Sequence, residues 1–306
     1  MKKHITTVTL NPCIDRTIIL DNFKLGGTNH VKNIREDIAG KGINVAVALK
    51  YFEIPCKCIG FGFDRDFEKM VNFFEEHSLL HGLVRTEGNL RVNLKIFDND
   101  TKQMTECNEK GKLTNKESMN EFYHMLKDEL TQAQLLVVDG SVPQGVESDC
   151  YAKIICEAST HDVPVILDAT GDLLLEGIKE KPFLIKPNKE EFCNTFCCEE
   201  KDMEKKALEL VKNGIQYVCI SLGEEGAMLV TQKGIQKMPA ISVPVRSLQG
   251  AGDAMVAGMC KAIWDKNESQ LLTYALCSAA SAVSHEGTQM GSLDEFNKLL
   301  HQIMNS

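Results

Sequence analysis

Hydrophobic residues in the second half of the chain fall into short runs, separated by longer segments in which apolar side chains recur at helical spacing. The runs are too short for buried helices and are rich in Val, Ile and Leu, so they are typical of buried strands. Strands and helices that take turns in this way indicate a parallel sheet with helices on both faces. The predicted strands are 134–139, 165–168, 183–186 and 217–222.

The first half begins with the same kind of pattern. Apolar runs bounded by glycine, proline or asparagine predict strands, and longer stretches with apolar residues three and four apart predict helices. The expected elements are a strand over 5–10, a helix from the glycine turn 39–42 to residue 52, a strand over 56–62 and a helix over 64–77.

Two segments of the first half, 14–37 and 91–108, do not fit this alternation. Each carries β-branched or alternating residues on both sides of a turn, at 26–27 and 99–100, which predicts a hairpin. The two hairpins could pair with each other as a small sheet outside the main one. A third hairpin is expected over 227–238, and the chain is mostly helical from residue 251.

Composition limits the kinds of partner. The chain has 306 residues, 43% of them hydrophobic, which favours a single α/β domain spanning 1–306. A net charge of −9, with the basic residues scattered, argues against a nucleic-acid or membrane surface and favours small molecules. Asn11 and Pro12 interrupt the first apolar run, so it does not read as a signal peptide, and we expect a cytoplasmic protein with its 12 cysteines reduced.

The segment 250–253 is the strongest candidate for chemistry. Gly250 and Gly252 precede a predicted helix, whose first backbone N–H groups form a natural anion site. Asp253 would repel a resting phosphate but could take a proton from a hydroxyl that attacks one. The alternative is an ordinary helix start with an acidic first turn. Phosphoryl transfer by a P-loop is excluded because Gly42 stands where that motif needs Ser or Thr, and Met255 breaks a dinucleotide fingerprint.

Five segments in the same order resemble the PfkB carbohydrate kinases, which share the ribokinase fold. They are 39–46, 139–143, 186–191, 221–226 and 250–253, and the resemblance covers essentially the whole chain. It implies an α/β, ribokinase-like fold with a mostly parallel central sheet, helices on both faces and a small β-sheet lid made of the two hairpins. It also implies ATP as phosphoryl donor, Mg²⁺, and a homodimer formed through the lid.

The opening segment 7–17 is similar to the branch that phosphorylates phosphosugars, and most similar to its 1-phosphofructokinase group. This resemblance implies ATP-dependent phosphorylation of fructose 1-phosphate at the C6 hydroxyl, giving fructose 1,6-bisphosphate. Tagatose-6-phosphate kinase is the first alternative. A non-catalytic regulator that binds a sugar phosphate on the same fold is the second.

The resemblance assigns site residues by position. Asp253 is the catalytic base, and backbone N–H groups of Gly250, Ala251 and Gly252 stabilise the transferring phosphoryl group. The substrate-binding residues are Asp15, Gly40, Lys41, Asn44, Arg91 and Ser141. The ATP-binding residues are Asn188, Ser221, Gly223, Gly226, Gly252 and Gly287, and Asn188 and Glu191 hold the metal through water. The spacing of Asn188 and Glu191 alone fits a helix N-cap with an acidic first turn equally well.

The chain departs from the family pattern at three places: Ala39 replaces a glycine, Asp139 replaces a serine, and 247–249 has an unusual sequence. An added carboxylate at Asp139 would repel a phosphosugar if it faced the pocket.

Overall fold

The computed structural model describes residues 4–111, 116–285, 287 and 291–305. Its larger sheet has nine strands in the order β13-β12-β11-β10-β9-β8-β1-β4-β5. The strands are β1 (His4–Thr9), β4 (Cys56–Phe63), β5 (Leu80–Thr86), β8 (Ala133–Asp139), β9 (Val165–Asp168), β10 (Leu184–Ile185), β11 (Tyr217–Ser221), β12 (Ala227–Thr231) and β13 (Gly234–Met238). All neighbours from β11 to β5 pair in parallel, and β12 and β13 are antiparallel. The predicted mostly parallel sheet is therefore confirmed.

The sequence missed one strand, β5. It forms the edge of the sheet next to β4, and its first residue, Leu80, is exposed. An edge strand buries few of its side chains, so the continuous apolar run that marks the central strands is missing here.

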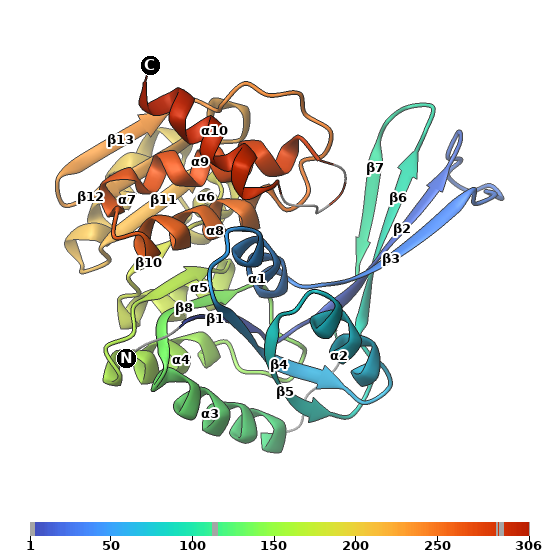
Figure 1. Ribbon diagram of the computed structural model, residues 1–306, viewed down its shortest axis with the longest axis horizontal. Helices are drawn as coiled ribbons and strands as arrows, with labels where there is room; N and C mark the ends of the chain where they lie inside the picture. The colour runs from blue at the N-terminus through green and yellow to red at the C-terminus, as the bar shows by residue number, and fades with distance from the viewer. Residues whose placement is uncertain (1–3, 112–115, 286, 288–290, 306) are drawn as a thin grey trace.

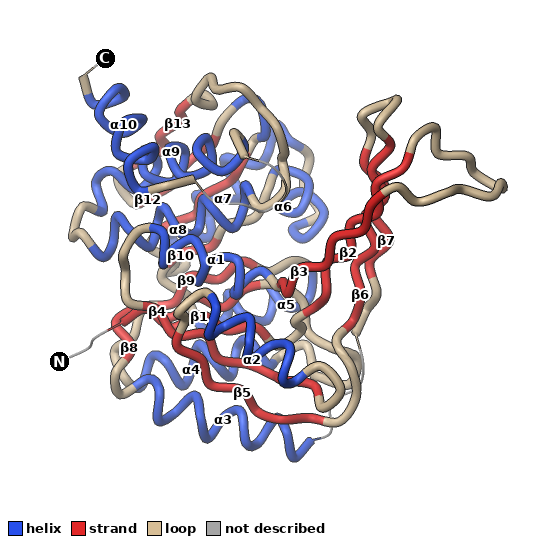
Figure 2. The backbone as a smooth tube through the Cα atoms, turned by 45° about the vertical axis from the view of Figure 1, so that its right-hand side comes forward, coloured by secondary structure: helices blue, strands red, loops and turns tan. Residues whose placement is uncertain are grey.

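Helices cover both faces of the sheet, as predicted (Figures 1 and 2). They are α1 (Lys41–Tyr51), α2 (Phe67–Glu76), α3 (Lys116–Leu130), α4 (Cys150–Thr160), α5 (Gly171–Gly177), α6 (Lys189–Phe196), α7 (Met203–Lys212), α8 (Ala251–Trp264), α9 (Leu271–Val283) and α10 (Leu293–Met304). Helices α1, α8, α9 and α10 contact one another in sequence on one side, and α3 to α7 do so on the other. In this arrangement α1 and α8 pack side by side and begin at the same edge of the sheet.

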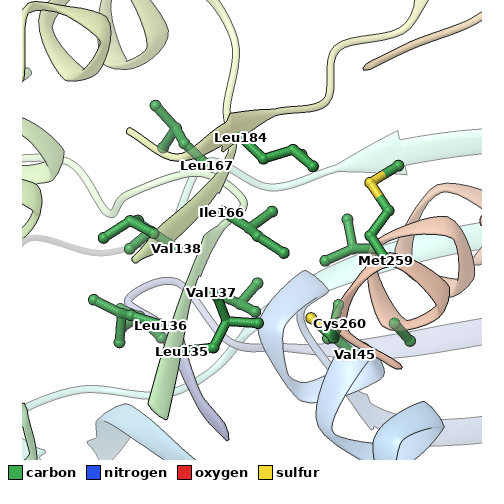
Figure 3. Packing of buried hydrophobic residues seen from close by; sticks show 14 of the residues in the cluster. Val45, Leu135, Leu136, Val137, Val138, Ile166, Leu167, Leu184, Met259 and Cys260 are labelled. Carbon is green, nitrogen blue, oxygen red and sulfur yellow. The ribbon is translucent and has the colours of Figure 1, made fainter. Parts of the chain in front are cut away.

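The core lies between β8, β9 and these helices (Figure 3). Val137 and Ile166 are fully buried, as are Val45 from α1 and Cys260 from α8. Burial of such side chains contributes roughly 1.5–3 kcal/mol each, so the packing fixes α1 and α8 firmly on the sheet. The beginnings of both helices are thereby held in a constant position relative to the ends of β8 and β9.

Four strands form a second sheet, the lid sheet, in the order β3-β2-β6-β7. They are β2 (Cys13–Leu20), β3 (Asn33–Ala39), β6 (Arg91–Asp98) and β7 (Met104–Asn108). The two predicted hairpins do pair with each other, through parallel β2 and β6. The lid sheet projects away from the main body in Figures 1 and 2. Both its central strands start next to the edge of the main sheet where the site lies.

Candidate active site

Three polar residues follow neighbouring strands at one edge of the main sheet. Asp139 ends β8, Asp168 ends β9, and Lys186 comes directly after β10. The register of β8 and β9 places Asp139 opposite Asp168. Both aspartates are 1% exposed and Lys186 is 3% exposed. Carboxyl ends of parallel strands form the usual binding edge of open α/β sheets, so this cluster marks the site.

Helix α8 brings Asp253 to the same cluster. Gly250 caps the helix with a left-handed backbone (φ 75°) that favours glycine, and no side chain caps it, so its first N–H groups point toward the site. Asp253 lies in the first turn, 7% exposed. Asn44 of α1 donates a hydrogen bond from Nδ2 to Asp253 Oδ2 at 2.7 Å. That bond holds the carboxylate in place.

Lys41, the first residue of α1, lies between the acids. Its Nζ is 3.6 Å from Asp168 Oδ2 and 3.8 Å from Asp139 Oδ1. Gly42 lets this turn approach the sheet, because a Cβ there would lie 2.5 Å from the Val8 carbonyl oxygen. Carboxylate oxygens of the three aspartates lie within 4.8 Å of one another, a spacing that also suits a metal ion.

The charges of the cluster shift several pKa values. Burial raises the pKa of Asp253 to about 6, against the opposing effects of Lys41 and Asn44. Burial also raises the pKa of Asp139 well above its usual value, and Asp168 raises it further. Asp168 raises the pKa of Lys41 against the effect of burial. A base whose pKa is near neutrality, beside lysines that stay charged, is suited to proton transfer.

Two cavities meet at Lys41 and Glu191, which line both. The first cavity has a volume of about 220 Å³. It is lined by Thr9, Asn11, Lys41, Arg91, Asp139, Gly140, Ser141, Ala169, Thr170, Leu173 and Glu191. The second cavity has a volume of about 380 Å³. It is lined by Asp15, Lys41, Asn44, Lys95, Glu106, Asp168, Lys186, Asn188, Glu191, Ser221, Gln249, Gly250, Gly252 and Asp253. The two adjoining cavities share Lys41 and Glu191, and Asp253 lines the second of them.

The lid sheet supplies polar side chains to this site from one face. Lys95 Nζ donates to Asp15 Oδ2 at 2.6 Å, and Asn93 Nδ2 donates to Asp15 Oδ1 at 3.0 Å. Gln249 Nε2 lies 3.5 Å from Glu106 Oε1 of β7, and both residues also line the second cavity. The lid sheet thus touches the loop that leads into α8 and forms a wall of the cavity.

Asn188 and Glu191 form a capping box at the start of α6. Asn188 Oδ1 accepts from the Glu191 N–H, and Glu191 Oε2 accepts from the Asn188 N–H, each at 2.8 Å. The cap that the spacing allowed is therefore present, and both side chains also line the second cavity. An amide oxygen and a carboxylate at the edge of a polar cavity fit a water-mediated Mg²⁺ site, so the residues suit both roles.

Most of the predicted site residues line one of the two cavities, and a few do not. Gly40 immediately precedes Lys41 at the cap of α1. Ala251, Gly223, Gly226 and Gly287 are absent from the linings of the two cavities. Gly226 has a packing reason instead, because a Cβ there would lie 2.0 Å from the Met238 carbonyl oxygen. At Gly287, a Cβ would lie 2.5 Å from the Arg35 guanidinium of the lid sheet.

Sequence reasoning missed five residues that line the second cavity: Asp168, Lys186, Lys95, Glu106 and Gln249. Asp168 and Lys186 had a usable signal, since each follows a predicted parallel strand and so lies at the binding edge. Lys95 and Glu106 had none, because each lies within a hairpin strand and reaches the site only through the direction of the lid sheet.

Comparisons with known proteins agree with this arrangement. The sequence model of the pfkB carbohydrate kinase family matches residues 8–295. A 1-phosphofructokinase from Vibrio cholerae is 30% identical, over 99% of this chain and 96% of that protein. Phosphofructokinase-2 from Escherichia coli has the same fold, with a TM-score of 0.93 at 23% identity over 99% of each chain. Ribokinase from Thermotoga maritima gives 0.80 at 20% identity, over 98% of this chain and 99% of its own. Among the described residues, no helix is long and apolar enough to cross a membrane.

Proposed function

We propose a specific reaction for this chain, which belongs to the pfkB family of carbohydrate kinases and is a kinase. ATP donates its γ-phosphoryl group to the C6 hydroxyl of fructose 1-phosphate, giving fructose 1,6-bisphosphate and ADP. The observation that carries the proposal is the position of Asp253. It is buried in the first turn of α8, whose N-terminus has no side-chain cap. It also lines the second cavity, to which the lid sheet contributes one wall.

Asp253 acts as the general base in this proposal. It takes the proton of the C6 hydroxyl while that oxygen forms a bond to the γ-phosphorus and the bond to the bridging oxygen of ADP breaks. N–H groups of Gly250, Ala251 and Gly252 stabilise the charge on the transferring phosphoryl group. Lys186 assists them, because its charged Nζ lies next to Gly252, 3.5 Å from the position that a Cβ of that residue would occupy.

The acceptor lies across the two cavities, with its reactive hydroxyl at Asp253. Asp15, Lys41, Asn44, Arg91 and Ser141 hold it, next to the turn at Gly40. Asp15 is already bonded by two lid side chains, which orient its carboxylate for hydroxyl groups of the sugar. The nucleotide occupies the side formed by Asn188, Ser221 and the start of α8, with Gly223, Gly226 and Gly287 farther along its path.

Mg²⁺ is held through waters by Asn188 and Glu191. When bound, the ion neutralises charge on the donor phosphates as the phosphoryl group is transferred. The capping box keeps both side chains at the cavity edge before the ion binds, so little conformational entropy is lost on binding.

The outer face of the lid sheet forms the contact of a homodimer in this proposal. Ile18, Ile34 and Ile96 lie side by side on the face opposite Asp15, and Ile34 is 55% exposed. Neighbouring apolar side chains on an exposed sheet face are a typical interaction surface. Light scattering of the wild type and of Ile34→Glu tests this: a dimer that becomes a monomer supports it, and a wild-type monomer contradicts it.

A coupled assay of ADP release tests the proposed reaction. Fructose 1-phosphate, tagatose 6-phosphate, fructose 6-phosphate and fructose are compared side by side with ATP and Mg²⁺. We expect the highest kcat/KM with fructose 1-phosphate. A higher value with tagatose 6-phosphate would establish the first alternative. Tight binding of a sugar phosphate without turnover of any acceptor would establish the regulator.

A further inference from the structure

The side chain of Asn11 joins two segments that lie far apart in the sequence. Asn11 comes just after β1 and is 4% exposed. Its Nδ2 donates to Ser141 Oγ at 2.9 Å and to the backbone carbonyl of Lys110 at 3.1 Å. A carbonyl oxygen can only accept, so the amide nitrogen of Asn11 must be the group that faces Lys110. Both hydrogens of this amide are therefore used by the protein.

The hydrogen bond from Asn11 decides how the Ser141 hydroxyl is used. A serine hydroxyl can act as a donor or as an acceptor. Because Ser141 Oγ accepts from Asn11, its own hydrogen must point away from that bond. Ser141 is exposed and lines the first cavity, and among the described residues its hydroxyl has no acceptor. It is therefore set to donate to a molecule bound in that cavity.

Arg91 is held by the same segments as Asn11. Its Nε donates to the backbone carbonyl of Asn11 at 3.2 Å, and its Nη1 donates to the carbonyl of Glu109 at 3.0 Å. Asn11 and Arg91 thus bind the neighbouring carbonyls of Lys110 and Glu109. Within the part of the chain that the structure describes, Nη2 of Arg91 has no acceptor, and Arg91 lines the first cavity. This end of the guanidinium is available to a ligand.

The first cavity therefore brings donors and positive charge together. It is lined by Ser141, Arg91 and Lys41. Phosphate oxygens accept hydrogen bonds, and those from charged donors are the strongest. Asp139 does not oppose an anion, because its side chain is fully buried and burial raises its pKa well above the usual value. Glu191, which also lines the cavity, accepts a backbone N–H in the cap of α6.

We infer that Asn11 is a positioning residue for the non-reacting phosphate of the acceptor, because it makes the Ser141 hydroxyl a donor and fixes the segment that holds Arg91. The inference rests on the proposed function, since it takes the acceptor to be a phosphosugar whose reactive hydroxyl lies at Asp253. Asn11 acts through these two groups. It removes their alternative orientations before the acceptor binds, which lowers the entropic cost of binding.

Steady-state kinetics of wild type, Asn11→Ala, Ser141→Ala and the double variant test the inference, with fructose 1-phosphate and ATP varied in turn. Asn99→Ala is the matched control. Asn99 Nδ2 donates to Asp21 Oδ1 at 3.0 Å and so joins the two hairpins of the lid, but Asn99 lines neither cavity. Thermal unfolding identifies the variants that are folded. If Asn11→Ala does not fold, Asn11→Ser replaces it, because a hydroxyl can still supply one of the two donors.

We expect Asn11→Ala to raise the KM for fructose 1-phosphate roughly tenfold, with kcat within about twofold of wild type and an unchanged KM for ATP. Asn99→Ala should leave all three values unchanged. The loss in the double variant should be smaller than the product of the two single losses, because Asn11 acts partly through Ser141. An unchanged KM, a fall in kcat alone, or losses that multiply in the double variant would overturn the inference.

The wild type separates this test from that of the proposed function. If it phosphorylates tagatose 6-phosphate and not fructose 1-phosphate, the proposed reaction is wrong, and the same variants decide the role of Asn11 with that acceptor. If it phosphorylates no phosphosugar, both the proposed function and the inference fail.

Discussion

Buried carboxylates lie at both ends of the central strands, and their surroundings differ. At the amino ends, Glu129 of α3 is 5% exposed and accepts hydrogen bonds from His4, from Thr6 at 3.0 Å and from Lys57 at 2.6 Å. At the carboxyl ends, Asp139 has no hydrogen-bond partner among the described groups. The first carboxylate is saturated by its own protein, and the second is left open.

This difference separates a structural use of charge from a functional one. The hydrogen bonds of His4 and Lys57 hold the pKa of Glu129 at about 2, against the effect of burial. The pKa of Asp253 is instead raised to about 6 by burial. A carboxylate saturated by donors stabilises the fold, whereas a buried one whose pKa is raised is costly and is typical of a functional site.

The largest effect is expected from Asp253→Asn, which removes the base and keeps the side-chain shape. We expect kcat to fall by about 10² to 10⁴, because an amide cannot accept the hydroxyl proton. The melting temperature should stay the same or rise, since a buried charge next to Asp168 is removed. Near-normal turnover in the coupled assay would show that Asp253 is not the base.

The next effect concerns stability at the other end of the strands. Glu129→Ala leaves His4 and Lys57 without their partner, and we expect about 3 kcal/mol less stability in urea unfolding. The kcat of the folded variant should be close to wild type, because the cluster is remote from both cavities. Glu129→Gln is the control, since it preserves the volume. A loss of kcat without a loss of stability would contradict the structural role.

Acid titration should distinguish the two clusters in one protein. Asp253 works as a base only when ionised, so kcat/KM should fall about tenfold per pH unit below its pKa of about 6. The pKa of Glu129 in the folded protein is lowered from its ordinary value of 4.5 to about 2, so its stabilising effect is complete above pH 4.5 and is lost as the pH falls toward 2. Activity should therefore be lost at a pH where the protein is still folded. Coincident loss of activity and of the circular dichroism signal would contradict this.

The smallest effect is expected from Glu191→Gln, because Glu191 serves both the cap of α6 and the proposed metal site. One oxygen of Glu191 is used in the capping box, which glutamine can also form. We therefore expect unchanged stability and a roughly tenfold higher Mg²⁺ requirement. An unchanged Mg²⁺ titration curve would remove Glu191 from the metal site.

The local sequence pattern was enough to predict the central strands of the main sheet and the starts of the helices next to the site. Short apolar runs indicated the central strands, and 165–168 is the strand β9. The glycine turns at 39–42 and 250–253 correctly marked the starts of α1 and α8, because only particular backbone conformations and close approaches are possible there. The capping box at Asn188 and Glu191 was likewise readable from spacing alone.

The sequence by itself thus determined most of the elements, the kinase family and the segments that carry the site, because these depend on local spacing and on motifs. Only the tertiary structure decided which charges meet. The parallel register places Asp139 opposite Asp168, and the packing of α1 beside α8 brings Asn44 to Asp253. Such contacts join residues far apart in the chain, and the unpaired oxygens of Asp139 are visible only when every neighbouring donor has been placed.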